Sequence, residues 1–126
     1  MKNTLSLINY RIDNIMADFQ AIEKTNKYAL CIQIRFGLNE ERDKGIIEIS
    51  PIIKDDVNGT TIYAITNTSY YDLPQLSSEE ECITLLKESG AEEAYNQTKD
   101  IMNKILKISN VDFIELPQFN TSMLEK

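Results

Sequence analysis

Residues Tyr28–Leu38 alternate between large apolar and small or polar side chains, a period-two pattern over eleven positions. This alternation is typical of a β-strand buried on one face, whereas a helix would repeat its apolar positions every three or four residues. We therefore expect a sheet with one covered face. The inward row is Tyr28, Leu30, Ile32, Ile34, Phe36 and Leu38, and the outward row is Ala29, Cys31, Gln33, Arg35 and Gly37.

The segments that follow predict two more strands. The polar loop Asn39–Gly45 ends in glycine and indicates a hairpin, after which Ile46–Ile53 returns as a strand. Pro51 has no N–H to donate, so it predicts a sheet edge or a bulge near that point. Asp55–Gly59 has the chemistry of a turn, and Thr60–Tyr71 is rich in Thr, Ile and Tyr, as strands are. Strands with such short connections favour an antiparallel meander.

The N-terminal segment Leu5–Ile22 is also expected to be extended. Its apolar positions change parity between Leu7 and Ile8, and a bulge there would reconcile the two halves. The alternation fades around Asn14–Gln20, where a short helical turn stays open.

Helical periodicity replaces alternation in the second half. Ser78 and Glu81 form a capping box before a short helix that carries Cys82, Ile83, Leu85 and Leu86. Gly90 is expected to end that helix. Residues Ala91–Ile108 form the longest predicted helix, ended by Asn110 and followed by an extended segment around Pro117 and a final helical turn within Phe119–Lys126. The predicted apolar stripe of the long helix is Ala91, Ala94, Tyr95, Thr98, Ile101, Met102, Ile105 and Ile108.

The composition bounds the class of protein. The chain has 126 residues, 42% of them hydrophobic and 26% charged, so we expect one globular α+β domain over residues 1–126. The net charge of −7 and the lack of a Lys/Arg cluster argue against nucleic acid and anionic membranes as partners. The N-terminus has no apolar signal-peptide stretch, so we expect a cytoplasmic protein with two free cysteines.

The residue types disfavour catalysis. The sequence has no histidine, which removes the usual general base and the commonest metal ligand, and its four glycines build no phosphate loop. Cys82 near a helix start is the main catalytic candidate, but it follows three glutamates and lies on an apolar stripe, which favours a core cysteine. Asp55–Gly59 resembles part of a calcium loop but has no closing glutamate, so a turn is favoured. We expect no enzyme activity, metal or cofactor.

Two groups of residues stay open to a binding role. The acidic run Glu79–Glu81 reads as a capped and solvated helix start, with an acidic partner-binding patch as the alternative. The second group is Tyr63, Tyr70 and Tyr71. We interpret them as core aromatic residues of a strand, and the alternative is that they line a peptide groove.

Several segments resemble the SecB export chaperones. Tyr10-Arg11-Ile12 followed by Asp18-Phe19-Gln20-Ala21 is similar to the first SecB strand, Thr60–Leu73 is similar to the last strand, and Leu116–Asn120 is similar to the Pro-x-x-Asn-Phe segment after the long helix. The resemblance extends over nearly the whole chain, in order. It implies a four-stranded antiparallel Greek-key sheet packed on two C-terminal helices.

The resemblance also implies a function. SecB-like proteins assemble as dimers of dimers and hold unfolded clients in an apolar groove beside the helix, without ATP. We therefore expect a homo-oligomeric (dimeric or tetrameric) holdase for unfolded polypeptides or preproteins. The alternative is a scaffold subunit that binds one specific folded partner and has no role in export. The side chains expected to contact a client are Tyr63, Tyr70, Tyr71, Leu73, Tyr95 and Phe113.

The chain departs from the SecB pattern at two points. Acidic residues that dock the translocase motor in SecB align with the uncharged Met16, Gln20 and Ala64, which argues against motor docking. The connection that walls the client groove in SecB shrinks here to Glu23–Lys27 and has no tryptophan, so a shallower groove is expected. A divergent SecB-like protein fits best, either of the small Gram-positive kind without an assigned role or of the kind paired with a toxin–antitoxin system.

Overall fold

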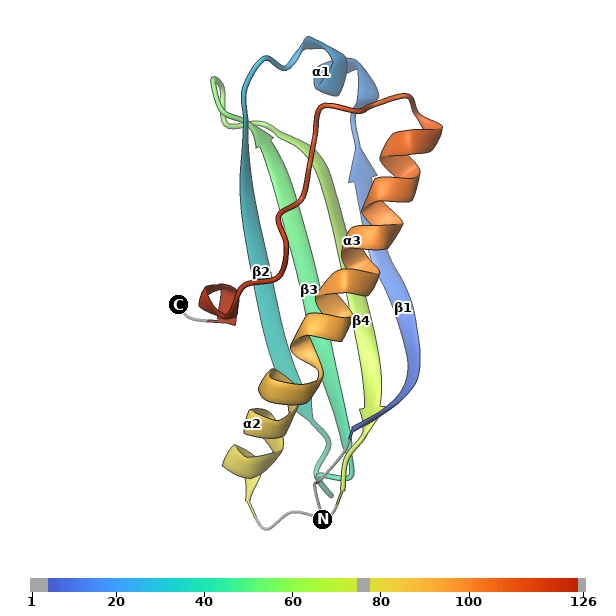
Figure 1. Ribbon diagram of the computed structural model, residues 1–126, viewed down its shortest axis with the longest axis vertical. Helices are drawn as coiled ribbons and strands as arrows, with labels where there is room; N and C mark the ends of the chain where they lie inside the picture. The colour runs from blue at the N-terminus through green and yellow to red at the C-terminus, as the bar shows by residue number, and fades with distance from the viewer. Residues whose placement is uncertain (1–4, 75–77, 125–126) are drawn as a thin grey trace.

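The computed structural model describes residues 5–74 and 78–124, which form a four-stranded antiparallel sheet with its helices on one face (Figure 1). This confirms the predicted α+β class. The elements in chain order are β1 (Ser6–Ala17), α1 (Phe19–Lys24), β2 (Tyr28–Leu38), β3 (Lys44–Asp55), β4 (Thr61–Asp72), α2 (Glu79–Ser89), α3 (Ala91–Ile108) and the 3-10 turn η1 (Thr121–Leu124).

The strand order is β1-β4-β3-β2, so the chain makes a Greek key rather than a simple meander. β2, β3 and β4 follow one another through hairpins, whereas β1 lies beside β4 and reaches β2 by a crossing over the end of the sheet through α1 (Figure 1). The Asp18 side chain caps α1 by accepting from the Ala21 N–H. The open question at residues 14–20 is thus answered by a strand that ends at Ala17 and a short helix from Phe19.

β2 has the alternation that its sequence predicts. Its even-numbered residues face the helices: Ile34 lies opposite Ile49 and is buried, and Leu30 lies opposite Ile53 and is half-buried. The odd-numbered residues point to the other face, which none of the helices in the described residues covers (Figure 1). We call these the helix-side face and the outer face.

The expectation of a sheet edge near Pro51 is wrong, because β3 is a central strand, whereas the alternative of a bulge nearby agrees with a register shift toward β4 between Ile53 and Lys54. Pro51 pairs with Ile32 of β2. Toward β4 the pairing lapses between Ile49 and Ile52 and then resumes in the same register. The missing Pro51 N–H therefore leaves a local gap in the pairing of β3 with β4 and does not displace β3 from the sheet.

The helices begin and end largely as predicted. The Ser78 hydroxyl accepts from the Glu81 N–H at 3.1 Å, as a capping box requires, and Asn110 ends α3 with a φ of 60°. Gly90 alone separates α2 from α3. The predicted stripe of α3 needs one correction: Ile108 is 81% exposed and Leu106 is buried in its place, one turn after Met102 on the same side of the helix.

The core lies between the sheet and the helices in two clusters. One includes Tyr63, Ile65 and Met102, and the other includes Ile47, Tyr71 and Leu86. Between them α3 meets β4 through polar side chains: Asn67 Nδ2 donates to Thr98 Oγ1 at 3.0 Å. The C-terminal segment completes the layer, with Ile114 and Leu116 in the first cluster and the Phe119 ring against Tyr95.

Candidate polypeptide-binding surface

Exposed apolar side chains are concentrated on β1. Among the described residues, six of the ten large apolar side chains that are exposed belong to this strand. They are Leu7, Ile8, Tyr10, Ile12, Ile15 and Met16, and Phe19 follows directly after the strand. Single exposed apolar residues are ordinary, but a run of them on one strand indicates a contact surface.

Four of these side chains form one row on the helix-side face. Tyr10 lies opposite Ser69, Ile12 opposite Asn67 and Ile15 opposite Ile65, and these β4 residues are all buried toward α3. Directly opposite residues share a face of the sheet. The row is Leu7, Tyr10, Ile12 and Ile15, with exposures of 36%, 46%, 37% and 48%, and we call it the edge row.

The edge row lies outside the main packing contacts of α3. α3 packs on β3 and β4, to which the Tyr63 hydroxyl ties it by donating to the Met102 carbonyl oxygen at 3.1 Å. β1 is the edge strand beyond β4, and within the described residues it pairs with β4 alone. Its outer edge therefore presents backbone N–H and C=O groups next to apolar side chains, which is a template for strand addition.

One flank of α3 faces the edge row. Lys104 forms an ion pair with Asp100 at 2.9 Å, and its pKa is raised by that hydrogen bond first and, to a smaller degree, by the nearby Tyr10 phenol. Ile101 and Ile108 lie on the same flank as Lys104, three and four positions away. An apolar strand row and an amphipathic helix flank thus border the same stretch of surface.

The outer face of β1 is more polar. Asp13 accepts a hydrogen bond from the Thr68 hydroxyl and pairs with Arg11 Nε at 2.5 Å, while the Arg11 guanidinium lies 5.7 Å from the centre of the Tyr70 ring. The hydrogen bond from Thr68 is the main cause that lowers the pKa of Asp13, followed by Arg11. Met16, which pairs with Ala64 near the end of β1, also lies on this face.

A pocket of about 380 Å³ opens on the outer face near the β2–β3 hairpin. The register of β1 shifts between Leu7 and Asn9, so Ile8 and Asn9 both stand opposite Tyr70. This is the bulge that the sequence predicts near Leu7–Ile8. The pocket is lined by Ile8, Gly37, Leu38, Ile46, Tyr70 and Tyr71, with Asn39, Lys44 and Gly45 completing it, and we call it the outer pocket.

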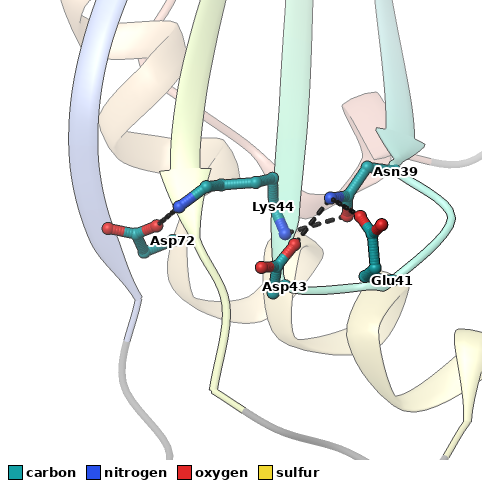
Figure 2. A network of polar contacts seen from close by, with 5 residues as sticks. All are labelled: Asn39, Glu41, Asp43, Lys44 and Asp72. Carbon is teal, nitrogen blue, oxygen red and sulfur yellow. Dashed lines mark hydrogen bonds and ion pairs between the residues drawn. The ribbon is translucent and has the colours of Figure 1, made fainter.

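The hairpin beside the outer pocket is held by Asn39 (Figure 2). Its side-chain amide donates to Glu41 Oε2 at 3.2 Å and to Asp43 Oδ1 at 2.6 Å, and its Oδ1 accepts from the Lys44 N–H at 3.0 Å. The Lys44 ammonium bonds to Asp72, its partner at the end of β4, and that hydrogen bond raises the Lys44 pKa. The rim of the pocket is therefore ordered by its own side chains.

Most of the residues expected to contact a client lie in the core. Tyr63, Tyr71 and Tyr95 are at most 1% exposed and Leu73 is 8% exposed. Their hydroxyl groups hold the helix layer on the sheet: Tyr71 donates to the Gly90 carbonyl oxygen at 3.4 Å and Tyr95 donates to that of Pro117 at 2.6 Å. Tyr70, which lines the outer pocket, is half-buried, and Phe113 is 45% exposed.

Sequence reasoning did not single out the edge row. Its signal is the alternation of Leu7, Tyr10, Ile12 and Ile15, but bulges after Leu7 and after Ile12 break the period twice. The exposure of the row also depends on how far α3 reaches, which no local pattern records.

The remaining sequence-based candidates lie in the core, on the outer face or in a turn. Cys82 is buried in the core, whereas Cys31 is exposed on the outer face. Asp55–Gly59 is a turn, with Val57 N–H bonded to Asp55 Oδ1 at 2.8 Å. Within residues 5–74 and 78–124, no three His, Cys, Asp or Glu side chains gather where they could hold a metal ion. Nor does any helix in those ranges have the length and apolar character to cross a bilayer.

Comparison with known proteins points to one fold. No family model matches the sequence, and no curated protein matches it. Among solved structures, the chain is similar to the Mycobacterium tuberculosis Rv1957 SecB-like chaperone, solved in complex with a ChAD peptide from the Rv1956 HigA1 antitoxin. The TM-score is 0.68 at 10% sequence identity, over 93% of this chain and 91% of that one. At this identity the likeness shows a shared SecB-like fold.

Proposed function

We propose that this chain, which has a SecB-like fold, binds extended segments of other polypeptides and holds them without ATP, in the cytoplasm. The observation that carries the proposal is the edge row, a line of apolar side chains on a strand whose outer edge offers free backbone groups. An extended client could pair with that edge while its apolar side chains cover the row. Burial of apolar area would supply the affinity.

The solved neighbour supports a polypeptide as the partner, because its SecB-like chain is seen with a bound peptide. That peptide comes from one antitoxin, which favours a second candidate: a single dedicated partner rather than many clients. A pull-down with several denatured proteins separates the two. A general holdase retains most of them, whereas a dedicated binder retains none and captures one folded or disordered protein.

The main test is suppression of aggregation. The purified protein, without ATP, should slow light scattering by chemically denatured citrate synthase at stoichiometric ratio. The double substitution Ile12→Ser with Ile15→Ser should remove most of that effect, because it makes the middle of the edge row polar. Val57→Ser is the matched control, because Val57 is 82% exposed in the β3–β4 turn, away from the row. Equal activity of all three proteins would contradict the proposal.

The same substitutions should leave the fold intact. Ile12 and Ile15 are 37% and 48% exposed, and exposed substitutions usually change the free energy of unfolding by less than about 0.5 kcal/mol. Urea unfolding of the double variant checks this. A loss of activity with unchanged unfolding would locate the effect in binding rather than folding.

We propose further that β1 meets a second copy of the chain, as a homo-oligomer requires. An antiparallel β1–β1 contact would continue the sheet across both copies and occupy the same edge as a client, so a client would have to displace the second copy. Light scattering coupled to size exclusion should then give a dimer or tetramer for the wild type and a smaller species for the Ile12→Ser, Ile15→Ser variant. A wild-type monomer at all concentrations would contradict self-association and leave the edge row free for clients.

A further inference from the structure

Gly37 lets the Ile46 side chain lie close to the β2 backbone in the lining of the outer pocket. Gly37 lies in β2 opposite Ile46, and a Cβ on Gly37 would come within 2.9 Å of Ile46 Cγ1. No positive φ requires glycine at this position. The glycine instead makes room for the Ile46 side chain, which lines the outer pocket together with Ile8.

The size and lining of the outer pocket limit what it can hold. Its 380 Å³ lies at the small end of the range for ligand pockets, which is about 300 to 1,000 Å³. The walls include the side chains of Ile8 and Ile46 and the Tyr70 ring. A space of this kind fits one large uncharged group and not an extended cofactor.

The rim of the pocket carries polar groups that are already engaged. The Lys44 ammonium is paired with Asp72, and Asn39 donates within the hairpin to Glu41 and Asp43 (Figure 2). An apolar group can therefore enter without taking a partner away from either side chain, so the cost of desolvating the rim is small. The rim needs no reordering before binding, which also favours affinity.

The pocket adjoins the free edge of the sheet. Ile8 belongs both to the pocket and to β1, and β1 pairs with β4 alone among the described residues. A polypeptide that lies along this edge can bond to the β1 backbone while one of its side chains turns onto the outer face. A free small molecule could use only the pocket.

We propose that the outer pocket is an anchor site for one large apolar side chain, aromatic or aliphatic, of an extended polypeptide that passes the β1 edge. This inference rests on polypeptide binding as the proposed function and adds a second contact, on the face of the sheet opposite the edge row. The pocket would set the register of the bound segment, because only the side chain beside Ile8 can enter it.

The test is an NMR titration of the uniformly ¹⁵N-labelled full chain. The probe is a nine-residue peptide of alternating threonine and serine with one central phenylalanine, and the reference peptide has serine in its place. The phenylalanine peptide should shift the amide signals of Ile8, Gly37, Ile46 and Tyr70 and bind at least about tenfold more tightly, as expected for burial of one aromatic side chain. Equal binding of the two peptides, or no binding, overturns the proposal.

Three substitutions locate the effect. Gly37→Leu should displace the Ile46 side chain and take up space in the pocket, and Ile8→Ser should remove one wall at a site that is 52% exposed; both should abolish the preference for phenylalanine. Met16→Ser is the matched control, on the same strand and the same face but outside the pocket, and it should keep the preference. An equal loss in Met16→Ser and Ile8→Ser overturns the proposal. If Gly37→Leu fails to fold, the comparison of Ile8→Ser with Met16→Ser still decides.

Two further measurements separate the alternatives. N-acetylphenylalanine amide should bind much more weakly than the peptide, and equal affinity would show a small-molecule pocket and overturn a polypeptide occupant. The Ile12→Ser, Ile15→Ser variant leaves the pocket residues unchanged, so it should keep the preference for phenylalanine. If wild type suppresses aggregation but shows no such preference, the anchor site is overturned while the proposed function stands.

Discussion

Asn67 lies at the centre of the contact between α3 and β4, between the two apolar clusters of the core. Its side chain is fully buried, and Nδ2 donates to Thr98 Oγ1, which itself donates to the Ala94 carbonyl oxygen at 2.8 Å. Within the described part of the chain, Asn67 Oδ1 has no hydrogen-bond partner. A buried acceptor without a partner costs about 1 to 3 kcal/mol. We infer that this pair fixes the position of α3 along β4 at some expense of stability.

Removal of both polar groups should therefore do less harm than removal of one. Thr98→Val alone leaves Asn67 Nδ2 without its acceptor and should lower the free energy of unfolding by about 1 to 3 kcal/mol. Asn67→Leu combined with Thr98→Val should be at least as stable as the wild type. Urea unfolding of the three proteins checks this, and a double variant less stable than Thr98→Val would show that Asn67 contributes a bond not accounted for here.

The junction of α2 and α3 illustrates a constraint at the scale of elements. Gly90 is the only residue between the two helices, it is buried, and its φ of −121° is open to any residue. Close approach is what requires glycine: a Cβ would lie 2.7 Å from Ile47 Cδ1 and 2.9 Å from Leu5 Cδ1. The start of α3 is thereby pressed against β3 and the residue before β1.

Gly90→Ala should destabilise the protein although alanine favours helices. The added methyl group must displace the ends of Ile47 and Leu5, and overpacking of this kind costs about 1 to 3 kcal/mol. The neighbouring exposed Ser89→Ala is the control and should change the free energy of unfolding by less than about 0.5 kcal/mol. Chemical denaturation compares the two. A stabilised Gly90→Ala protein would mean that the helices move apart at no cost.

Elements defined by local patterns could be predicted from the sequence. β2 follows from alternation, the hairpin from its polar loop, and the start of α2 from Ser78 and Glu81. The neighbours of an element could not be predicted in this way, because pairing and coverage are set by residues far apart in the chain. Pro51 shows this: its missing N–H predicts an edge strand, yet β3 is held centrally by β2 on one side and β4 on the other.

The candidate site shows the same limit at the scale of the whole molecule. Tyr63, Tyr71 and Tyr95 have the residue type of a peptide groove, but the helix layer lies directly over them. The edge row has an ordinary strand composition and stays exposed because α3 packs mainly on β3 and β4. Whether an apolar residue is core or contact surface thus depends on the placement of the second layer, which the sequence pattern does not record.

The buried tyrosines predict how the whole fold responds to alkaline pH. Burial raises the pKa of Tyr63 to about 12 and also raises the pKa of Tyr71 and Tyr95, above about 10 in an unfolded chain. The folded state therefore keeps protons that the unfolded state releases. The resulting stability is fully present below about pH 10 and is lost as the pH rises toward about 12.

We expect the urea midpoint to fall steeply above about pH 10, with tyrosinate absorbance appearing together with loss of the far-ultraviolet helix signal. Tyr63→Phe is the informative variant, because it keeps the ring and removes one titrating group, so its decline with pH should be shallower. A midpoint that does not change with pH up to 12, or ionisation of these phenols without unfolding, would contradict the burial described here.

The Greek key has a consequence for the order in which the chain acquires its structure. β1 leaves the ribosome before the other three strands of this sheet, but it pairs with β4; Asp13 and Thr68, which bond across this pair, stand 55 positions apart. β2, β3 and β4 can form their two hairpins through short loops, at a small cost in chain entropy, before that long loop closes. The strand that carries the apolar row should thus be the last to dock in folding and the first to detach, and hydrogen exchange should find its amides the least protected of the sheet.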